Sequence, residues 1–211
     1  MNLLLNNAPD YVKVDGRKEF LNTDFRTSIR FELLMNDSTK SDEEKLSQAM
    51  RLYYGQRSFP GKNIEEAVNK LLWFYTCGKE PEKQDKKETG KKNTVSKVRV
   101  YDYEHDADYI YSAFLQQYNV DLQTEKIHWW KFKAMFRALT DQCEFVKIMG
   151  YRSIEINNNM TKSQKEFYQK MKKLHALPLP KSEVQKIKAI EDALLNGGDL
   201  SAVIGMINGP R

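Results

Sequence analysis

The sequence predicts a mainly α-helical fold, in the form of a multi-helix bundle with a small N-terminal β-hairpin and a flexible, Lys-rich loop. Three observations lead to this fold class. Apolar residues recur at helical spacing along most of the chain, an Asp-Gly pair joins two short alternating runs near the N-terminus, and a Lys-rich central stretch has almost no apolar residue. The composition agrees, because 40% of the 211 residues are hydrophobic, 30% are charged and only ten are Gly.

The hairpin is predicted at residues 10–22, DYVKVDGRKEFLN, since Asp15-Gly16 is a pair favoured in tight two-residue turns. Thr23 or Asp24 then offers a side-chain oxygen that can cap a first helix. The predicted apolar face of this helix consists of Phe25, Ile29, Leu33 and Leu34.

Two further helices are predicted before residue 78. The first begins at Ser41, which forms a capping box with Glu44, and ends at Gly55. The second begins at Asn63, another capping residue. The predicted inward-facing residues are Leu46, Ala49, Met50 and Tyr53 in the first helix, and Ala67, Leu71, Leu72 and Tyr75 in the second.

Residues 79–97 interrupt the helical pattern. They contain seven Lys interleaved with four acidic residues, no aromatic residue, and Val95 as their only aliphatic side chain. Such a segment cannot bury enough apolar surface to offset the entropy of ordering, so we predict a flexible linker or loop. The chain is therefore divided into residues 1–78, with the hairpin and helices, the linker 79–97, and a helical part 98–211. Whether the two outer parts form one domain is left open.

The C-terminal part is predicted to contain several helices. Asp106 is a plausible cap for a helix whose inward residues are Ala107, Ile110, Tyr111, Phe114 and Leu115. A Lys-rich helix over residues 162–174 follows Thr161, and a last helix over 182–195 follows two prolines. The apolar tail after it offers candidate partner-binding residues, which are Leu200, Val203, Ile204, Met206 and Ile207.

Residues 127–139, IHWWKFKAMFRAL, are open to three interpretations: a partner-binding surface, a platform that stacks nucleotides, or a buried helix. On a helix the aromatic residues form one broad apolar arc, which is typical of a central helix that touches several neighbours. A stacking platform would present its rings on a loop or sheet among basic groups. We therefore predict a structural core that includes Phe25, Ile110, Phe114, Trp129, Trp130, Phe132 and Phe136.

No catalytic, metal-binding or cofactor-binding residue is predicted. The acidic stretch DYEHDAD, residues 102–108, lacks the spacing of a calcium loop, and its carboxylates suit a helix N-terminus. The three His are far apart, Cys77 and Cys143 are isolated, and no nucleotide-binding glycine motif occurs. The net charge of +5 resides largely in the linker, which has no aromatic residue to stack a base, so nucleic-acid binding is not expected. Neither a signal peptide nor a membrane span is expected, which favours a reducing cytoplasm.

Four segments occur in a defined order: DFRTSIRFELL, YDYEHDADYIYSAFLQQYNVDL, HWWKFKAMFRAL and FVKIMGYR, after an N-terminal VDG turn. With this order and the Trp-Trp-x-Phe spacing, the chain resembles the bacteriophage gp-fifteen family of long-tailed phages and prophages of Gram-positive bacteria. The resemblance extends from Asp10 to about Leu179. The linker 79–97 and the tail after Pro180 match least.

The resemblance implies a non-enzymatic role in the phage tail. Genes of the family typically lie between those of the major tail protein and the tape measure protein, where tail assembly chaperones are encoded. The implied partner is therefore the tape measure protein, and the implied place is the host cytoplasm. A structural tail or neck component that stays in the virion is the alternative, and a nucleic-acid-binding protein is a third hypothesis. Self-association is left open.

The linker prediction can be tested by limited proteolysis of the full-length chain. Early cleavage should concentrate within residues 79–97, because a segment without an apolar stripe is open to proteases. The cleavage sites are mapped by mass spectrometry of the first fragments. Strong amide protection across the segment would contradict the prediction.

Overall fold

The computed structural model describes residues 2–55, 63–79 and 99–179. The predicted linker lies outside these residues except for Lys79, and the predicted helix over 182–195 and the apolar tail lie outside them entirely. The described chain is mainly helical with one small antiparallel hairpin, which confirms the predicted fold class. Its elements are β1 (Tyr11–Val14), β2 (Arg17–Phe20), α1 (Phe25–Asn36), α2 (Asp42–Tyr54), α3 (Ile64–Tyr75), α4 (Ala107–Tyr118), α5 (Trp129–Arg137), α6 (Glu144–Ser153) and α7 (Lys162–Leu174).

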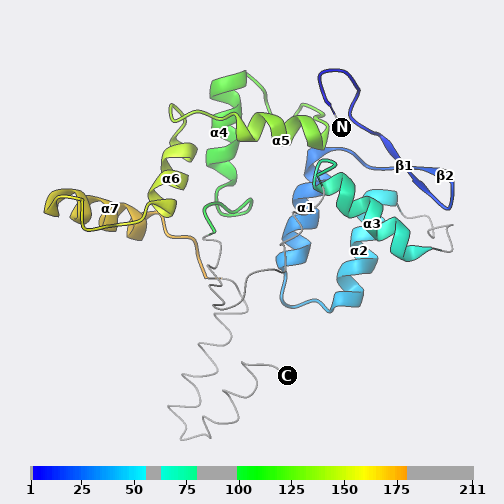
Figure 1. Ribbon diagram of the computed structural model, residues 1–211, viewed down its shortest axis with the longest axis horizontal. Coiled ribbons are helices and arrows are strands. Elements are labelled where there is room, and N and C mark those ends of the chain that lie inside the picture. The colour runs from blue at the N-terminus through cyan, green and yellow to red at the C-terminus, as the bar shows by residue number, and fades with distance from the viewer. Residues whose placement is uncertain (1, 56–62, 80–98, 180–211) are drawn as a thin grey trace, which may run out of the picture.

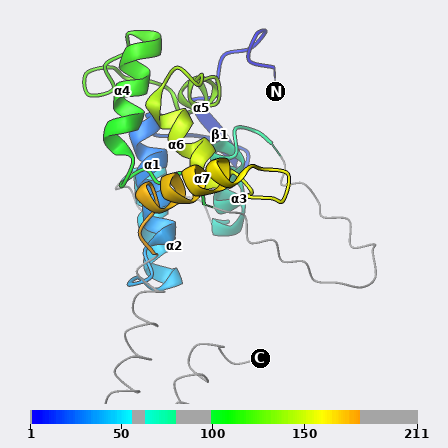
Figure 2. The same cartoon turned by 90° about the vertical axis from the view of Figure 1, so that its left-hand side faces the viewer.

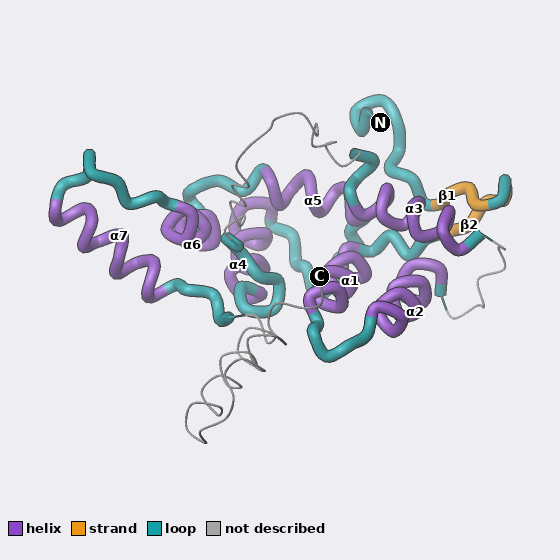
Figure 3. Tube along the Cα trace, turned by 60° about the horizontal axis from the view of Figure 1, so that its bottom comes forward, coloured by secondary structure: helices purple, strands orange, loops and turns teal. Residues whose placement is uncertain are grey.

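The described elements are arranged along one long axis (Figure 1). The hairpin lies beside α2 and α3 at one end, α1, α4 and α5 lie in the middle, and α7 lies at the other end. In Figure 2, seen from the α7 side, α7 lies in the foreground, and it packs against α6. The same separation of α7 from α1–α3 is visible in Figure 3.

The hairpin turn has the predicted chemistry. Asp15 and Gly16 both have positive φ, at 49° and 73°, as a type I′ turn requires. Val12 and Val14 point to the core while Lys13 between them is exposed, and the backbone N–H of Asp15 donates to Glu66 of α3 at 2.9 Å. The hairpin is therefore anchored on α3.

The predicted helix starts are confirmed, but three inward faces are corrected. Asp24, Asn63 and Thr161 cap α1, α3 and α7, and Ser41 forms the predicted capping box at α2. Residues predicted to face inward but exposed in the structure are Leu46, Leu72, Ala107 and Leu115, whereas Phe74 and Ala113 are buried instead. For Leu72 and Leu115 the reason is geometric, since their neighbours Leu71 and Phe114 are buried, adjacent residues lie about 100° apart on a helix, and only one of each pair can face the same partner.

The centre of the core is α5. The ring of Phe132 is fully buried between the ring of Phe25 from α1, at 4.7 Å between centroids, and that of Phe114 from α4, at 4.9 Å. Both pairs are stacked, so one aromatic column joins three helices. The seven residues predicted as structural core all lie among the buried residues.

Two tryptophans connect α5 to the end of α3. The indole N–H of Trp129 donates to the carbonyl of Tyr75, and that of Trp130 donates to the carbonyl of Phe74, each at 2.8 Å. These carbonyls belong to the last turn of α3, and that of Phe74 also accepts from the backbone N–H of Cys77 at 3.0 Å. The pair Trp129-Trp130 is therefore a C-terminal cap supplied by another helix.

The chain leaves α3 in a conformation that fits this cap. Gly78 has φ +70°, and a Cβ added there would lie 3.0 Å from the Trp130 ring. Only glycine combines that backbone conformation with that close approach. The turn that follows α3 therefore needs glycine at position 78 for two reasons: its positive φ and the close approach of the Trp130 ring.

The starts of α1 and α5 are joined through their backbones. The N–H of Phe25 donates to Ile127 at 2.9 Å, and the N–H of Trp129 donates to Thr23 at 2.8 Å. Asp24 and His128, the two N-cap residues, thus form an antiparallel bridge. Both helices begin at one point, which fixes the position of Phe25 relative to Phe132.

The structural role of the tryptophans can be measured by unfolding. Trp129→Ala should lower the free energy of unfolding by about 3–5 kcal/mol, because it removes a buried aromatic ring. It also leaves the Tyr75 carbonyl without its indole donor. Leu72→Ala, on an exposed face of α3, is the matched control and should change stability by less than about 0.5 kcal/mol. An unchanged melting temperature for Trp129→Ala would refute the core assignment.

Candidate functional site

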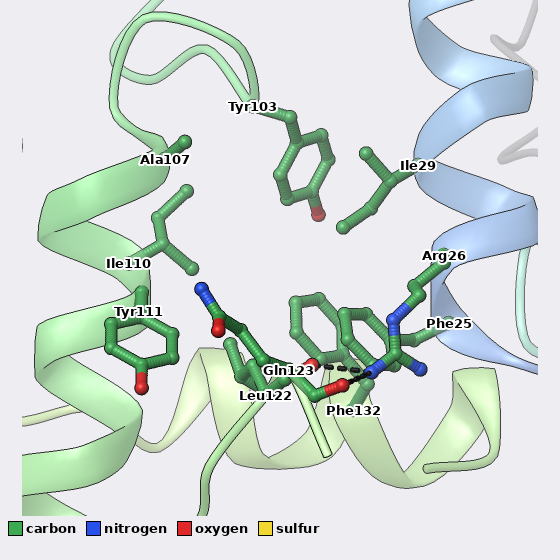
Figure 4. Close-up of a pocket in the computed structure, with 10 residues that line it drawn as sticks. All are labelled: Phe25, Arg26, Ile29, Tyr103, Ala107, Ile110, Tyr111, Leu122, Gln123 and Phe132. Carbon is green, nitrogen blue, oxygen red and sulfur yellow. Dashed lines mark hydrogen bonds between the residues drawn. The ribbon is translucent and has the colours of Figure 1, made fainter. Parts of the chain in front are cut away.

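An apolar cavity lies where α1, α4 and α5 meet (Figure 4). Its volume is about 190 Å³. Apart from Gln123, its walls come from the three segments DFRTSIRFELL, YDYEHDADYIYSAFLQQYNVDL and HWWKFKAMFRAL. The lining residues are Phe25, Arg26, Ile29, Tyr103, Ala107, Ile110, Tyr111, Leu122, Gln123 and Phe132.

The consecutive residues Asp24, Phe25 and Arg26 make different contacts at this site. Asp24 caps α1 by accepting from the backbone N–H of Arg26, and it also pairs with the Arg26 guanidinium at 3.0 Å. Phe25 stacks on Phe132. The guanidinium of Arg26 donates to the carbonyls of Leu122, Gln123 and Glu125, and Figure 4 shows the first two of these bonds. Arg26 thus holds the turn after α4 in place as one wall of the cavity.

Tyr103 is the polar residue of the inner wall. It is 6% exposed, and its hydroxyl makes no hydrogen bond of good geometry within the described residues. Burial raises the pKa of this phenol well above its ordinary value, so the group is a neutral donor. Figure 4 shows the hydroxyl directed inward, beside Ile29.

A buried ion pair lies on the far side of α4. The Arg152 guanidinium from α6 makes a bidentate contact with the Asp106 carboxylate, at 2.6 and 2.9 Å, and both side chains are buried. Arg152 also donates to the carbonyls of Val100 and His175, at the two ends of the C-terminal part that the structure describes. It therefore ties α4, α6 and the chain after α7 together.

This pair corrects the interpretation of the acidic stretch. Asp106 occupies the N-cap position of α4, but its side chain makes no capping hydrogen bond. Its carboxylate instead accepts from Arg152 and from the backbone N–H of Asp102. The helix dipole alone therefore does not explain why an acidic residue stands at position 106, because the main partner of its carboxylate is Arg152 on α6.

No catalytic constellation is assembled in the described residues. His105 is exposed, His128 caps α5, and His175 caps the end of α7. Cys77 and Cys143 are free thiols, and burial raises the pKa of Cys77, so that thiol is not an activated nucleophile. Across residues 2–55, 63–79 and 99–179, no three His, Cys, Asp or Glu side chains are grouped to hold a metal ion. None of the helices described is long and apolar enough to cross a membrane.

The exposed apolar surface of α7 is a second candidate site. None of the 13 residues of this helix is buried, although it is strongly amphipathic. Phe167 is 48% exposed and Leu174 is 67% exposed, and they lie on one face together with Met171. The rest of the helix includes five Lys and one Glu. This combination of an apolar face with a basic border suits the binding of a protein segment.

The predicted partner-binding residues in the tail, from Leu200 to Ile207, lie outside the described residues. Sequence reasoning placed Arg26 and Arg152 in segments that resemble the family but assigned no role to them or to Tyr103, because the contacts that decide these roles include residues that are distant in the chain. The Lys-rich pattern of α7 was recognised, but a helix pattern alone does not reveal whether its apolar face is covered.

Comparison with known proteins identifies the family. Residues 4–177 match the family model described as Bacteriophage Gp15 protein. The chain belongs to this family. The match includes both candidate sites and covers most of the chain. Gp15 proteins are phage structural or assembly proteins, and this is the class in which the chain is placed. No curated protein and no solved structure matches the chain significantly.

The cap at His128 predicts that the stability of this Gp15 protein depends on pH. Its Nδ1 accepts from the backbone N–H of Trp130 at 3.1 Å, and its Nε2 lies 3.1 Å from the Pro9 carbonyl. The cap therefore needs a neutral ring with the proton on Nε2. Burial lowers the pKa of His128 below its ordinary value of 6.5, although the Pro9 carbonyl and Asp10 act in the opposite direction.

When folding lowers the pKa of a group, the neutral form stabilises the folded state. This contribution is complete at pH values above the pKa of the unfolded state and is lost as the pH falls toward the pKa of the folded state. Thermal melting of the wild type should therefore show a loss of stability as the pH falls below about 6.5, and this loss should be smaller in His128→Asn, since Asn caps without titrating. The exposed residue His105 gives the control, His105→Asn. Equal losses in all three proteins would exclude this role for His128.

Proposed function

We propose that this phage protein is a tail assembly chaperone that binds the tape measure protein before the tail tube forms around it. Membership of the Gp15 family limits the class to phage structural or assembly proteins. The resemblance adds the position of the family's genes, next to that of the tape measure protein. The proposed site of action is the host cytoplasm.

The observation that carries this proposal is the uncovered apolar face of α7. A helix with its polar and apolar residues so well separated normally buries the apolar face against a neighbour. In α7 the ring of Phe167 contacts Tyr151 and Tyr168 at its edges, yet about half of the side chain stays exposed. A long helical client with an apolar stripe would cover this face in the groove-binding mode of amphipathic helices.

The basic border of α7 gives the client a charge preference. Lys162 and Lys165 lie near its start, and Lys170, Lys172 and Lys173 lie near its end. Lys162 has one partner within the helix, Glu166, at 3.9 Å. A client helix with acidic residues beside its apolar stripe would be attracted and oriented by these lysines.

The residues Leu200, Val203, Ile204, Met206 and Ile207 are a second proposed contact with the client or with another copy of the chain. Deletion of residues 198–211 addresses them separately from α7. Loss of binding in that truncation, with the main domain still folded, would assign the contact to the tail. Loss of the whole fold would show that the tail belongs to the core.

The central experiment is co-purification with the tape measure protein of the same phage. In the double variant Phe167→Ser, Leu174→Ser, capture should fall by at least about tenfold, because exposed apolar anchors dominate such interfaces. The matched control Leu46→Ser, Leu115→Ser changes two similarly exposed apolar residues on α2 and α4. Melting curves of both variants verify that each is folded.

The location of the protein separates a chaperone from a structural component. A chaperone is present in infected-cell lysates and absent from purified virions, and mass spectrometry of both samples measures this. Its presence in virions at tail stoichiometry would favour the alternative of a retained tail or neck component. A steep salt dependence of DNA binding would instead revive the nucleic-acid hypothesis.

A further inference from the structure

We propose that the predicted helix over residues 182–195 packs antiparallel on the exposed apolar face of α7 in the free protein and leaves it when a client binds. The docking is a contact within one chain and does not require a client. Its regulatory consequence rests on the proposed function, because the client would compete with the protein's own segment for α7. Three features support the docking: the exposed ridge of α7, the place where the chain leaves this helix, and the residue pattern of the segment.

The part of α7 that lacks a cover is a narrow ridge. Phe167 and Leu174 stand seven residues apart on one side of the helix and are 48% and 67% exposed. The exposed residue Lys170 lies between them in the sequence and beside them on the helix. A helix that covers this ridge must therefore bring apolar side chains together with an acidic residue that can meet the lysine.

The chain leaves α7 beside this ridge. The ring of Tyr151 from α6 contacts Phe167 edge to face, at 6.1 Å between centroids, and stacks on His175 at 5.8 Å. The carbonyl of His175 also accepts from the Arg152 guanidinium at 2.6 Å. The first residue after α7 is therefore held on the same ring as Phe167, so the chain that follows starts next to the surface that needs a cover.

The connection after α7 suits a helical hairpin. Residues 175–181, HALPLPK, separate α7 from the predicted helix, and residues 176–179 form no helix in the structure. Pro178 and Pro180 prevent α7 from continuing. Connections of about 2–8 residues are usual between neighbouring helices in bundles. At 1.5 Å per residue α7 is about 20 Å long and the predicted helix about 21 Å, so the second helix can follow the first along its whole length.

The pattern of residues 182–195 complements the ridge. Ile187 and Leu194 stand seven residues apart, as Phe167 and Leu174 do on α7. Glu183 lies four residues before Ile187, on the same side of the predicted helix. The segment has three acidic residues and two Lys, whereas α7 has five Lys and one Glu. Apolar contact and charge attraction therefore favour the same pairing.

Attachment to the same chain favours this occupant over a free one. A segment on a short linker acts at an effective concentration on the order of mM, so even a weak contact is populated. Pairing of α7 with the α7 of a second copy would instead bring two Lys-rich helices together, which like charges oppose. The segment 182–195 is thus the occupant that both the connection and the charges select.

The docking is tested by NMR on the full-length protein, through the backbone amide signals of α7. The double variant Ile187→Glu, Leu194→Glu places two charges in the apolar stripe of the segment and should release it. The signals of Phe167 and Leu174 should then shift relative to the wild type, because their side chains lose the cover. The indole N–H signals of Trp129 should stay unchanged and verify that the core is folded.

The matched control is Ala189→Glu, Ala193→Glu. It adds the same two charges on the opposite side of the predicted helix and should leave the α7 signals unchanged. Unchanged α7 signals in the first variant, or equal shifts in both variants, would overturn the proposal. A difference between wild type and first variant that disappears on dilution would also overturn it, because the segment of a second copy would then be the occupant.

The competition with the client is measured separately. If α7 binds the tape measure protein, Ile187→Glu, Leu194→Glu should lower the apparent Kd of the client by about tenfold, because the tethered competitor is removed. Client binding equal to or weaker than that of the wild type would overturn the competition. Client binding without the α7 shifts would remove the docking and leave the proposed function standing, whereas α7 shifts without client binding would do the reverse.

Discussion

The structure depends on two indole N–H groups that bind the last carbonyls of α3. Trp129 and Trp130 begin α5, and through Tyr75 and Phe74 they join the described residues before position 80 to those after position 98. A helix end buried without partners would be costly, and here the partners arrive on large rings that also fill the core. The two tryptophans thus donate hydrogen bonds to backbone carbonyls and also fill space in the core with their rings. This dual role requires a glycine at position 78, in the turn that follows α3, because a Cβ there would lie 3.0 Å from the Trp130 ring.

The other contacts around α5 follow from its position. Once Trp129 is held by α3 and by Thr23, Phe132 falls one turn further along, between Phe25 and Phe114. The shared start of α1 and α5 places Arg26 within reach of the 122–125 turn. The cavity is the space that this arrangement leaves between α1 and α4. Its walls belong to the three helices whose relative position the tryptophans establish, so the cavity and the core are physically continuous.

The two candidate sites differ in the chemistry that they offer. The cavity is small and mainly apolar and lies between helices of the core, whereas the face of α7 is exposed, basic and peripheral. Arg152 connects the two regions, since it pairs with Asp106 at the start of α4 and with the His175 carbonyl at the end of α7. A buried pair of this kind is sensitive to the loss of either partner, because the remaining charge would be left without compensation. It holds α7 at the edge of the molecule without covering its apolar face.

The sequence by itself determined the elements whose signals are local. The Asp15-Gly16 turn, the caps at Asp24, Ser41, Asn63 and Thr161, and the aromatic arc of α5 could all be predicted, because each arises from residues within a few positions of one another. Only the tertiary structure decided which of two adjacent apolar residues faces inward, as at Leu71 and Leu72. It also decided that the Asp106 carboxylate pairs with Arg152 instead of capping α4, and that Tyr103 and Arg26 line the same cavity. These outcomes depend on contacts between residues that are tens of positions apart, and a helical period carries no information about which partner will lie opposite a given side chain.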